Sequence, residues 1–259
     1  MSRFLCIGHR GACGYEPENT LRSFRRALDL GADGLELDVQ LSGGELVVFH
    51  DAKLERTTNG RGPLRRKSFA DLRRLDAGHG EQIPTLREVI DTVARRAFLN
   101  IELKGRRTAR PVAALLAEYL ARGWEPNDFL ISSFLRRELK DFREAADSRI
   151  PLGLLLVRPT RLWLRSARAL GVSAVHPPLR YVRAGLVEKA HEHGLEVFVY
   201  TVNTPESIAR MRSLGVDGVF TDFPDRIARE PGESSGASRR PQLPAKTAQM
   251  VDGLDDGGE

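Results

Sequence analysis

Short runs rich in Val, Ile, Leu and Phe alternate along the chain with longer segments that have helical periodicity. This alternation is the pattern of repeated β-α units and predicts a parallel sheet. Eight runs fit it, and eight parallel strands close into a (β/α)₈ TIM barrel. The candidate strands are 4–8, 34–40, 98–103, 129–133, 151–156, 174–176, 197–201 and 218–221. The candidate helices between them are 20–30, 86–95, 110–122, 136–145, 162–170, 183–193 and 205–214.

Two stretches fall outside this rhythm. Residues 46–51 have the pattern of an extra strand, and the polar segment 52–84 separates it from the next helix, so we expect a small insertion over about 42–84, after the second strand. From residue 231 onward the chain is rich in Pro, Gly, Ser and acidic residues without periodicity, a composition that cannot bury enough apolar surface to order itself. We therefore expect one barrel domain over 1–230 and a disordered tail over 231–259.

The net charge of +5 comes largely from clustered arginines, but no aromatic-rich nucleic-acid motif accompanies them, so we expect no nucleic-acid partner. The N-terminus lacks a signal-peptide pattern, and no apolar run approaches the roughly 20 residues of a membrane span. We expect a cytoplasmic protein without stable membrane insertion. The two cysteines, Cys6 and Cys13, lack the spacing of a disulfide framework or a zinc site, and we interpret both as buried thiols. The sequence leaves the oligomeric state open.

Acidic residues interrupt two of the candidate strands. In 34–40 the period of two places Glu36 and Asp38 on one face and aliphatic residues on the other. Glu102 and Lys104 share a face of the third candidate strand in the same way. Buried parallel strands are normally near-continuous apolar runs, and an unpaired carboxylate inside a barrel costs on the order of several kcal/mol. A positive group is therefore expected beside these acids.

The acids Glu36, Asp38 and Glu102 offer only oxygen ligands, which suits one divalent cation, Mg²⁺ or Ca²⁺, and disfavours zinc. The alternative is a buried ion-pair network in which Lys104 balances the acids without metal. Three acids against one lysine leave excess negative charge in a low-dielectric site, which favours the cation.

Two histidines stand at the ends of candidate strands, His9 after 4–8 and His50 near the end of the extra strand. Active sites of (β/α)₈ barrels lie at the carboxyl ends of the strands, and imidazole suits proton transfer near neutral pH. A lone histidine is more often structural. Here Arg10 adjoins His9 as an anion ligand and Asp51 adjoins His50 as an orienting carboxylate, so we interpret the two histidines as an acid-base pair.

An ordered set of short motifs runs through the predicted barrel. They are His9-Arg10-Gly11, Pro17-Glu18-Asn19-Thr20, Glu36-Leu37-Asp38-Val39, His50-Asp51, Glu102-Leu103-Lys104, Ser132-Ser133-Phe134, Thr201-Val202-Asn203 and 215–225. With these motifs the chain resembles the glycerophosphodiester phosphodiesterase family, over roughly residues 4 to 227. The resemblance implies a TIM-barrel enzyme that uses a divalent cation to hydrolyse small-molecule glycerophosphodiesters to sn-glycerol 3-phosphate and an alcohol.

The family's residue roles carry over to matching positions. By resemblance, the metal ligands would be Glu36, Asp38 and Glu102, the general acid and base His9 and His50, and the substrate contacts Arg10, Lys104, Phe134 and Tyr200. Tyr200 stands where the family commonly has tryptophan, which leaves the preferred alcohol open. Which histidine is the acid stays open too, as does the nucleophile, either water or the glycerol 2-hydroxyl through a cyclic phosphate.

Other functions fit the same residues. A lysophospholipase D or sphingomyelinase D type of activity would act on a lipid that still bears a chain, and Leu162 and Trp163 would then meet that chain or else pack as a buried helix face. A barrel that binds phosphate-bearing ligands without catalysis is the alternative from a different class. A metal-dependent aldolase would have little use for the pair His50 and Asp51.

Overall fold

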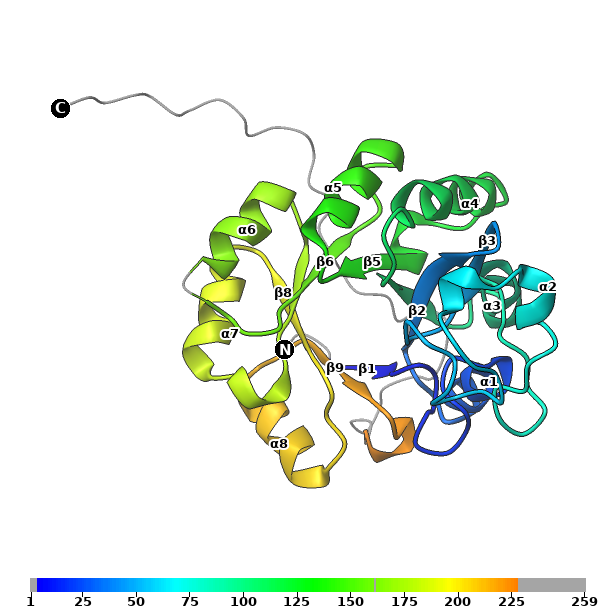
Figure 1. Ribbon diagram of the computed structural model, residues 1–259. Helices are drawn as coiled ribbons and strands as arrows, with labels where there is room; N and C mark the ends of the chain where they lie inside the picture. Colours follow the sequence, from blue (N-terminus) through cyan, green and yellow to red (C-terminus); the bar gives the residue numbers. More distant parts are fainter. Residues whose placement is uncertain (1–3, 161, 228–259) are drawn as a thin grey trace.

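Eight parallel strands close into a barrel, and helices surround it (Figure 1). The computed structural model describes residues 4–160 and 162–227, so the tail expected over 231–259 lies outside the described residues. β1 pairs with β9 on one side and with β2 on the other, which closes the ring. The strands are β1 (Leu5–Gly8), β2 (Gly34–Ser42), β3 (Glu45–Val48), β4 (Phe98–Leu103), β5 (Phe129–Ser133), β6 (Leu152–Leu155), β7 (Ala174–His176), β8 (Glu196–Val199) and β9 (Gly218–Thr221). The helices are α1 (Leu21–Asp29), α2 (Phe69–Leu72), α3 (Leu86–Val93), α4 (Ala109–Ala121), α5 (Arg136–Ala145), α6 (Trp163–Leu170), α7 (Ala184–His191) and α8 (Pro205–Ser213).

The (β/α)₈ fold predicted from the alternating pattern is confirmed. β3 is the extra strand, and it pairs antiparallel with β2 outside the ring. Thr20 caps the first helix by accepting a hydrogen bond from the backbone N–H of Ser23. None of the helices in the described ranges has the length and apolar content needed to cross a lipid bilayer.

The alternation along the strands separates two apolar regions. Residues such as Leu35, Leu37 and Ile101 point outward and pack in the layer between strands and helices. A second cluster fills the barrel interior, where Phe98 packs so close to β2 that a Cβ on Gly34 would lie 2.3 Å from its ring. Along β2 and β4 the inward positions nearer the carboxyl ends are occupied by acids instead of apolar residues. The polar site therefore lies at the carboxyl end of the barrel, next to the apolar interior.

His176 is a polar exception inside the barrel. Its side chain is fully buried between Phe198 and Phe220, with ring centroids 5.7 and 5.1 Å away. Neither ring nitrogen has a hydrogen-bond partner among the described residues. Burial lowers the pKa of His176 to about 3, so this imidazole is neutral at physiological pH.

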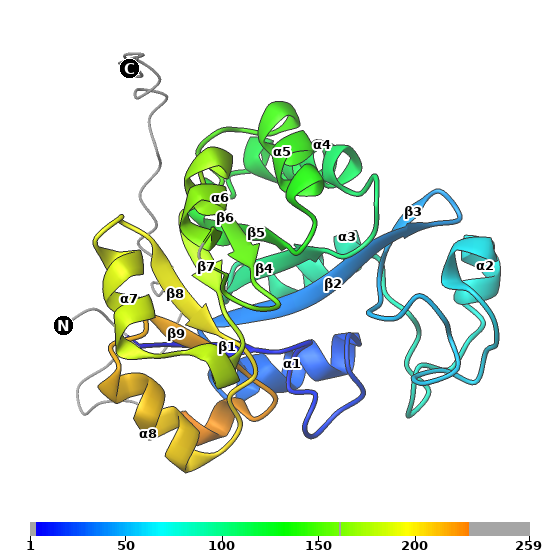
Figure 2. The ribbon, with the colours of Figure 1, turned by 60° about the vertical axis from the view of Figure 1, so that its left-hand side comes forward.

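The insertion after β2 forms a unit beside the barrel (Figure 2). We expected a polar segment over 52–84. The structure instead contains the short helix α2, capped by Ser68, and a separate apolar cluster. That cluster is Val47, Phe49, Leu54, Leu64, Leu72, Ala77 and Ile83. Its members are scattered among polar residues at irregular spacing, so no periodic pattern marked them.

Candidate active site

The inward acids of β2 and β4 converge in one cluster. Asp38 and Glu102 are paired across the two strands in the sheet register, and Glu36 precedes them on the same face. Oxygen atoms of the three carboxylates lie within 4.8 Å of one another, and the side chains are buried. Strand register thus produces an all-oxygen site from residues far apart in sequence.

The charges around these acids do not balance. Lys104 Nζ lies 3.1 Å from Glu102 and 3.4 Å from Asp38, and it holds the pKa of Asp38 below its usual range against the effect of burial. Burial and Asp38 nevertheless raise the pKa of Glu102 to about 7, and burial with the neighbouring acids raises that of Glu36 well above its usual range. One more positive charge is needed to keep all three ionised, and the donor set fits a hard divalent cation.

Arg10 joins the acid cluster to the loop after β1. Its backbone N–H donates to Glu36 at 2.9 Å, and its guanidinium contacts Asp38 at 3.3 Å and Glu18 at 2.8 Å. Asn19 donates to Asp38 at 2.9 Å. The segment that begins α1 therefore also supports the acids, and Glu18 positions Arg10.

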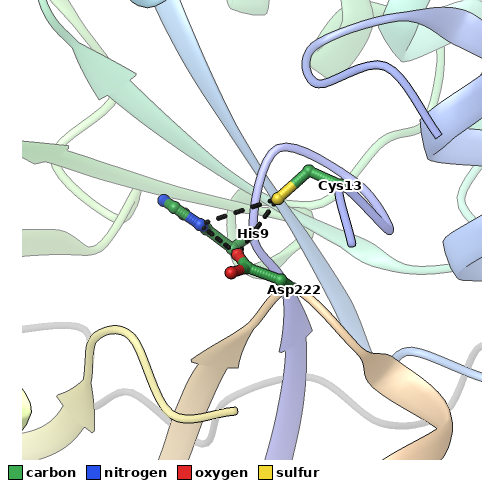
Figure 3. A group of neighbouring side chains, drawn as sticks. All are labelled: His9, Cys13 and Asp222. Carbon is green, nitrogen blue, oxygen red and sulfur yellow. Dashed lines mark hydrogen bonds and ion pairs between the residues drawn. The ribbon is translucent and has the colours of Figure 1, made fainter. Parts of the chain in front are cut away.

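His9 follows β1, and its ring is held by the carboxylate of Asp222, which is distant in sequence but lies beside it in the structure (Figure 3). Its Nδ1 lies 2.7 Å from Oδ1 of Asp222, the residue that directly follows β9. Asp222 also accepts from Asn203 Nδ2 at 2.6 Å and from Cys13 Sγ at 3.0 Å. Burial would raise the pKa of Asp222, but the hydrogen bonds from His9, Cys13 and Asn203 lower it to about 2. A permanently ionised carboxylate therefore orients the His9 ring.

His50 has the same arrangement with a partner next to it in sequence. Its Nδ1 lies 2.6 Å from Asp51 Oδ1, and Arg56 pairs with the other oxygen of Asp51. The hydrogen bond from Arg56 lowers the pKa of Asp51 to about 2. Burial, together with Arg10 and Lys104, lowers the pKa of His50 itself. Outside these pairs, Gln40 donates to the backbone carbonyls of residues 49, 50 and 51 and fixes the turn.

These side chains surround one cavity of about 330 Å³ at the carboxyl ends of the strands. It is lined by His9, Arg10, Glu36, His50, Asn100, Glu102, Lys104, Phe134, Leu155, Tyr200, Thr201 and Phe220. Phe134 and Tyr200 meet edge to face with centroids 6.1 Å apart, and Lys104 Nζ lies 5.7 Å from the Phe134 ring. Of the residues expected at the site, Asp38 alone is absent from the lining, because it is enclosed by its own partners.

The sequence profile described as the Glycerophosphoryl diester phosphodiesterase family matches residues 9–226. The chain belongs to that family. A glycerophosphodiester phosphodiesterase of Caldanaerobacter subterraneus subsp. tengcongensis is 38% identical over 240 residues, which cover 86% of this chain and 96% of the relative. One from Bacillus altitudinis is 36% identical over 239 residues, again 86% of this chain and 96% of the relative.

Members of the glycerophosphoryl diester phosphodiesterase family also share the fold. An Oleispira antarctica phosphodiesterase, solved in complex with the product sn-glycerol-3-phosphate, superposes with a TM-score of 0.79 at 32% identity, covering 85% of this chain and 94% of that one. A glycerophosphodiester phosphodiesterase of Thermotoga maritima gives 0.69 at 28% identity, covering 87% and 97%. The family membership inferred from the motifs is confirmed.

Several residues of this site were not singled out from the sequence as site residues. Asp222 and Asn203 lie in quoted motifs but received no role, and Gln40 and Arg56 received none either. A signal for Asp222 existed: β1 and β9 are the first and last strands of a closed ring, so the residues that follow them must be neighbours. The prediction of a buried thiol is correct for Cys6 and wrong for Cys13, which is partly exposed and lines a separate cavity beside the insertion.

Proposed function

We propose that this chain hydrolyses glycerophosphodiesters to sn-glycerol 3-phosphate and an alcohol. One observation carries the proposal: a single cavity of about 330 Å³ is bordered by two histidines, two cations and two of the three clustered acids. Each histidine has its own carboxylate partner. The family match and the product bound by the Oleispira antarctica relative support the same reaction.

The acid cluster would bind one divalent cation, Mg²⁺ or Ca²⁺, through Glu36, Asp38 and Glu102. Such an ion, when bound, neutralises negative charge on the phosphate and its transition state. Arg10 and Lys104 line the same cavity and would contact the remaining phosphate oxygens. Their positions match the need of a phosphodiester, whose own charge repels an attacking oxygen, for cationic neighbours.

The two imidazoles would move the protons. Asp222 and Asp51 hold the Nδ1 atoms, so each Nε2 is left to face the substrate. One histidine takes the proton of the attacking hydroxyl or water as its oxygen bonds to phosphorus. The other donates a proton to the alkoxide as the bond from phosphorus to the leaving oxygen breaks. The carboxylates stabilise whichever imidazole carries positive charge.

Phe134 and Tyr200 would contact the carbon skeleton of the substrate. Their edge-to-face pair forms an apolar wall opposite the polar side of the cavity. The Tyr200 hydroxyl donates to the carbonyl of Leu156 at 2.7 Å, so it is occupied within the protein and the ring presents mainly apolar surface. Such a wall can contact the glycerol carbons through its apolar surface.

Release of sn-glycerol 3-phosphate from a panel of glycerophosphodiesters, with chelator and with each cation restored, tests the reaction. His9→Ala and His50→Ala should each lower kcat by about 10² or more, the scale of general acid-base contributions. Unchanged turnover in either variant would remove that histidine from the mechanism. Accumulation of a cyclic phosphate in the slower variant would identify the glycerol 2-hydroxyl as the nucleophile.

A lysophospholipid is the second candidate substrate, because exposed apolar side chains lie beside the cavity. Leu155 lines the cavity at the end of β6, and two residues later Val157 is 65% exposed. Leu162 is 61% exposed, whereas Trp163 is buried in the helix layer, so of these two residues Leu162 alone could meet an acyl chain. Comparing glycerophosphocholine with lysophosphatidylcholine separates the two substrates, and an inert lysophospholipid would exclude this one.

A further inference from the structure

Three metal-binding atoms of different chemistry meet beside His9 (Figure 3). Of the three residues, only His9 lines the substrate cavity. Cys13 Sγ lies 3.0 Å from Asp222 Oδ1 and 4.0 Å from His9 Nδ1, and the last two atoms are 2.7 Å apart. Cys13 comes from the loop after β1, and Asp222 follows β9. The proposed reaction uses the His9 and Asp222 pair but has no role for the thiol.

The set of sulfur, nitrogen and oxygen suits a different ion from the all-oxygen cluster of β2 and β4. Thiolate and imidazole are preferred by Zn²⁺ and Cd²⁺ over Mg²⁺ or Ca²⁺. Around a tetrahedral zinc, bond lengths of about 2.0 to 2.3 Å place ligand atoms about 3.3 to 3.6 Å apart. The observed separations of 2.7, 3.0 and 4.0 Å bracket that range, so side-chain rotations that shift the ligand atoms by about half an ångström would suffice. Three protein ligands leave the fourth position to water.

The cluster is reachable without passing through the substrate cavity. The His9 and Asp222 side chains are 21% and 24% exposed. Cys13 lines a separate cavity of about 470 Å³ beside the insertion, and the acids Glu16, Glu18 and Asp76 also line it. Glu16 is paired with Arg22, and Glu18 with Arg10 and Arg56, so this cavity gives a cation a route to the cluster without a large excess of negative charge.

The environment of Cys13 disfavours oxidation of the thiol. Burial and the Asp222 carboxylate raise the pKa of Cys13, so without metal the thiol stays protonated and is a poor nucleophile. A divalent ion between sulfur and Asp222 cancels the repulsion that disfavours the thiolate. Metal binding thus reverses a condition that would otherwise keep Cys13 inert.

We propose that Cys13, His9 Nδ1 and Asp222 form a second cation site, specific for a thiophilic divalent ion, and that its occupation inhibits the enzyme. On binding, the S–H bond breaks, the proton passes to solvent and sulfur bonds to the metal. The His9 proton moves from Nδ1 to Nε2 as Nδ1 becomes a ligand. Nε2 then cannot accept a proton as a base, and it holds its own proton more firmly than an imidazolium does, so His9 loses either catalytic role. The inhibitory effect rests on the proposed role of His9, whereas the binding itself does not.

A cadmium titration followed by ultraviolet absorption tests the binding. A cadmium-thiolate bond gives a charge-transfer band, so the unsubstituted protein should develop that band with one equivalent of Cd²⁺. The Cys13→Ser variant should develop none, because its hydroxyl replaces the thiol as a donor to Asp222 but does not form a thiolate. Cys6→Ala is the matched control: Cys6 is buried and contacts the carbonyl of Pro224, so its loss should leave the band unchanged.

A zinc titration of diesterase activity, at a fixed excess of Mg²⁺ or Ca²⁺, tests the inhibition. Cys13→Ser should keep basal turnover within about twofold and need at least tenfold more Zn²⁺ for half-inhibition, since it lacks one of three ligands. Absence of the cadmium band in the unsubstituted protein overturns the site. Equal zinc sensitivity of both proteins, relieved by more Mg²⁺, overturns it too and points to the acid cluster. A chain that shows the band but cleaves no diester refutes the proposed function and leaves the metal site standing.

Discussion

Replacing Asp222 by asparagine tests how the chain orients His9. In the structure Asp222 Oδ2 accepts from the amide of Asn203 at 2.6 Å, while Oδ1 lies 2.7 Å from His9 Nδ1. An asparagine has one oxygen and one NH₂ group to offer these two neighbours. Because Asn203 requires an acceptor, the oxygen of Asn at position 222 must face Asn203 and its NH₂ group must face His9. Nδ1 then accepts instead of donating, and the proton of His9 moves to Nε2.

The expected loss in Asp222→Asn has two parts. A hydrogen bond to a charged group contributes about 1.5 to 3 kcal/mol, which corresponds to about 10 to 150-fold in rate. The wrong tautomer adds to this, and an equivalent change behind the histidine of serine proteases costs about 10⁴-fold. We therefore expect kcat to fall by about 10² to 10⁴-fold. KM should change little, because the residues proposed to contact the substrate are intact.

Steady-state release of sn-glycerol 3-phosphate from glycerophosphocholine measures this loss, with circular dichroism to show that the variant is folded. Cys13→Ser is the control, since it alters another neighbour of Asp222 and leaves the carboxylate in place. A folded Asp222→Asn protein with kcat within threefold of the parent would refute the orienting role. A rise in KM at constant kcat would refute it as well.

Three further outcomes follow from the charges and contacts of the site and the barrel interior. Glu36→Gln removes a buried acid that the neighbouring carboxylates repel, so the melting temperature measured in chelator should stay the same or rise. The increase in melting temperature on adding Mg²⁺ or Ca²⁺ should become smaller, because one metal ligand is lost. A lower melting temperature in chelator, with the increase on adding metal unchanged, would contradict this prediction. The pKa of His176 is about 3 in the folded state and about 6.5 in the unfolded state, so below pH 6.5 the unfolded state binds an extra proton. The stability of the folded protein therefore decreases as the pH is lowered. Between pH 8 and pH 5 this costs about 2 kcal/mol; urea unfolding of His176→Leu should show a pH dependence smaller by that amount, and an equal dependence would mean that His176 takes up protons while folded. Gln40→Ala frees the turn that holds His50 and should lower kcat about tenfold with the metal midpoint unchanged, whereas a shifted midpoint would tie Gln40 to the acid cluster.

The barrel and the acid cluster could be predicted because both depend on short-range periodicity. Alternation along 34–40 places Glu36 and Asp38 inward whatever the rest of the chain does, and the structure has them inward. The pairing of His50 with Asp51 was available for a similar reason, since the two are adjacent in sequence. Local sequence patterns therefore predicted the acids on the strands and the pairing of His50 with its neighbour.

The remaining parts depend on contacts that no local pattern records. Asp222 is 213 positions from His9, and only the register of Gly8 against Thr221 brings them together. The insertion core was missed because its apolar residues have no period, and α2 is only 4 residues long. Cys13 was expected inside because its spacing fits neither a disulfide framework nor a zinc site, but it lies in the loop after β1 and is partly exposed.

The bond between His9 and Asp222 crosses the seam where the first and last strands meet. The ribosome synthesises His9, His50 and the acids of β2 and β4 well before Asp222, the carboxylate that lies beside the His9 ring. The ring must shut before that imidazole is aligned, so competence for cleavage should arise with completion of the fold. Chains that lack β9 and Asp222 would contain the acid cluster but no carboxylate beside His9, so under the proposed mechanism they should not cleave diesters.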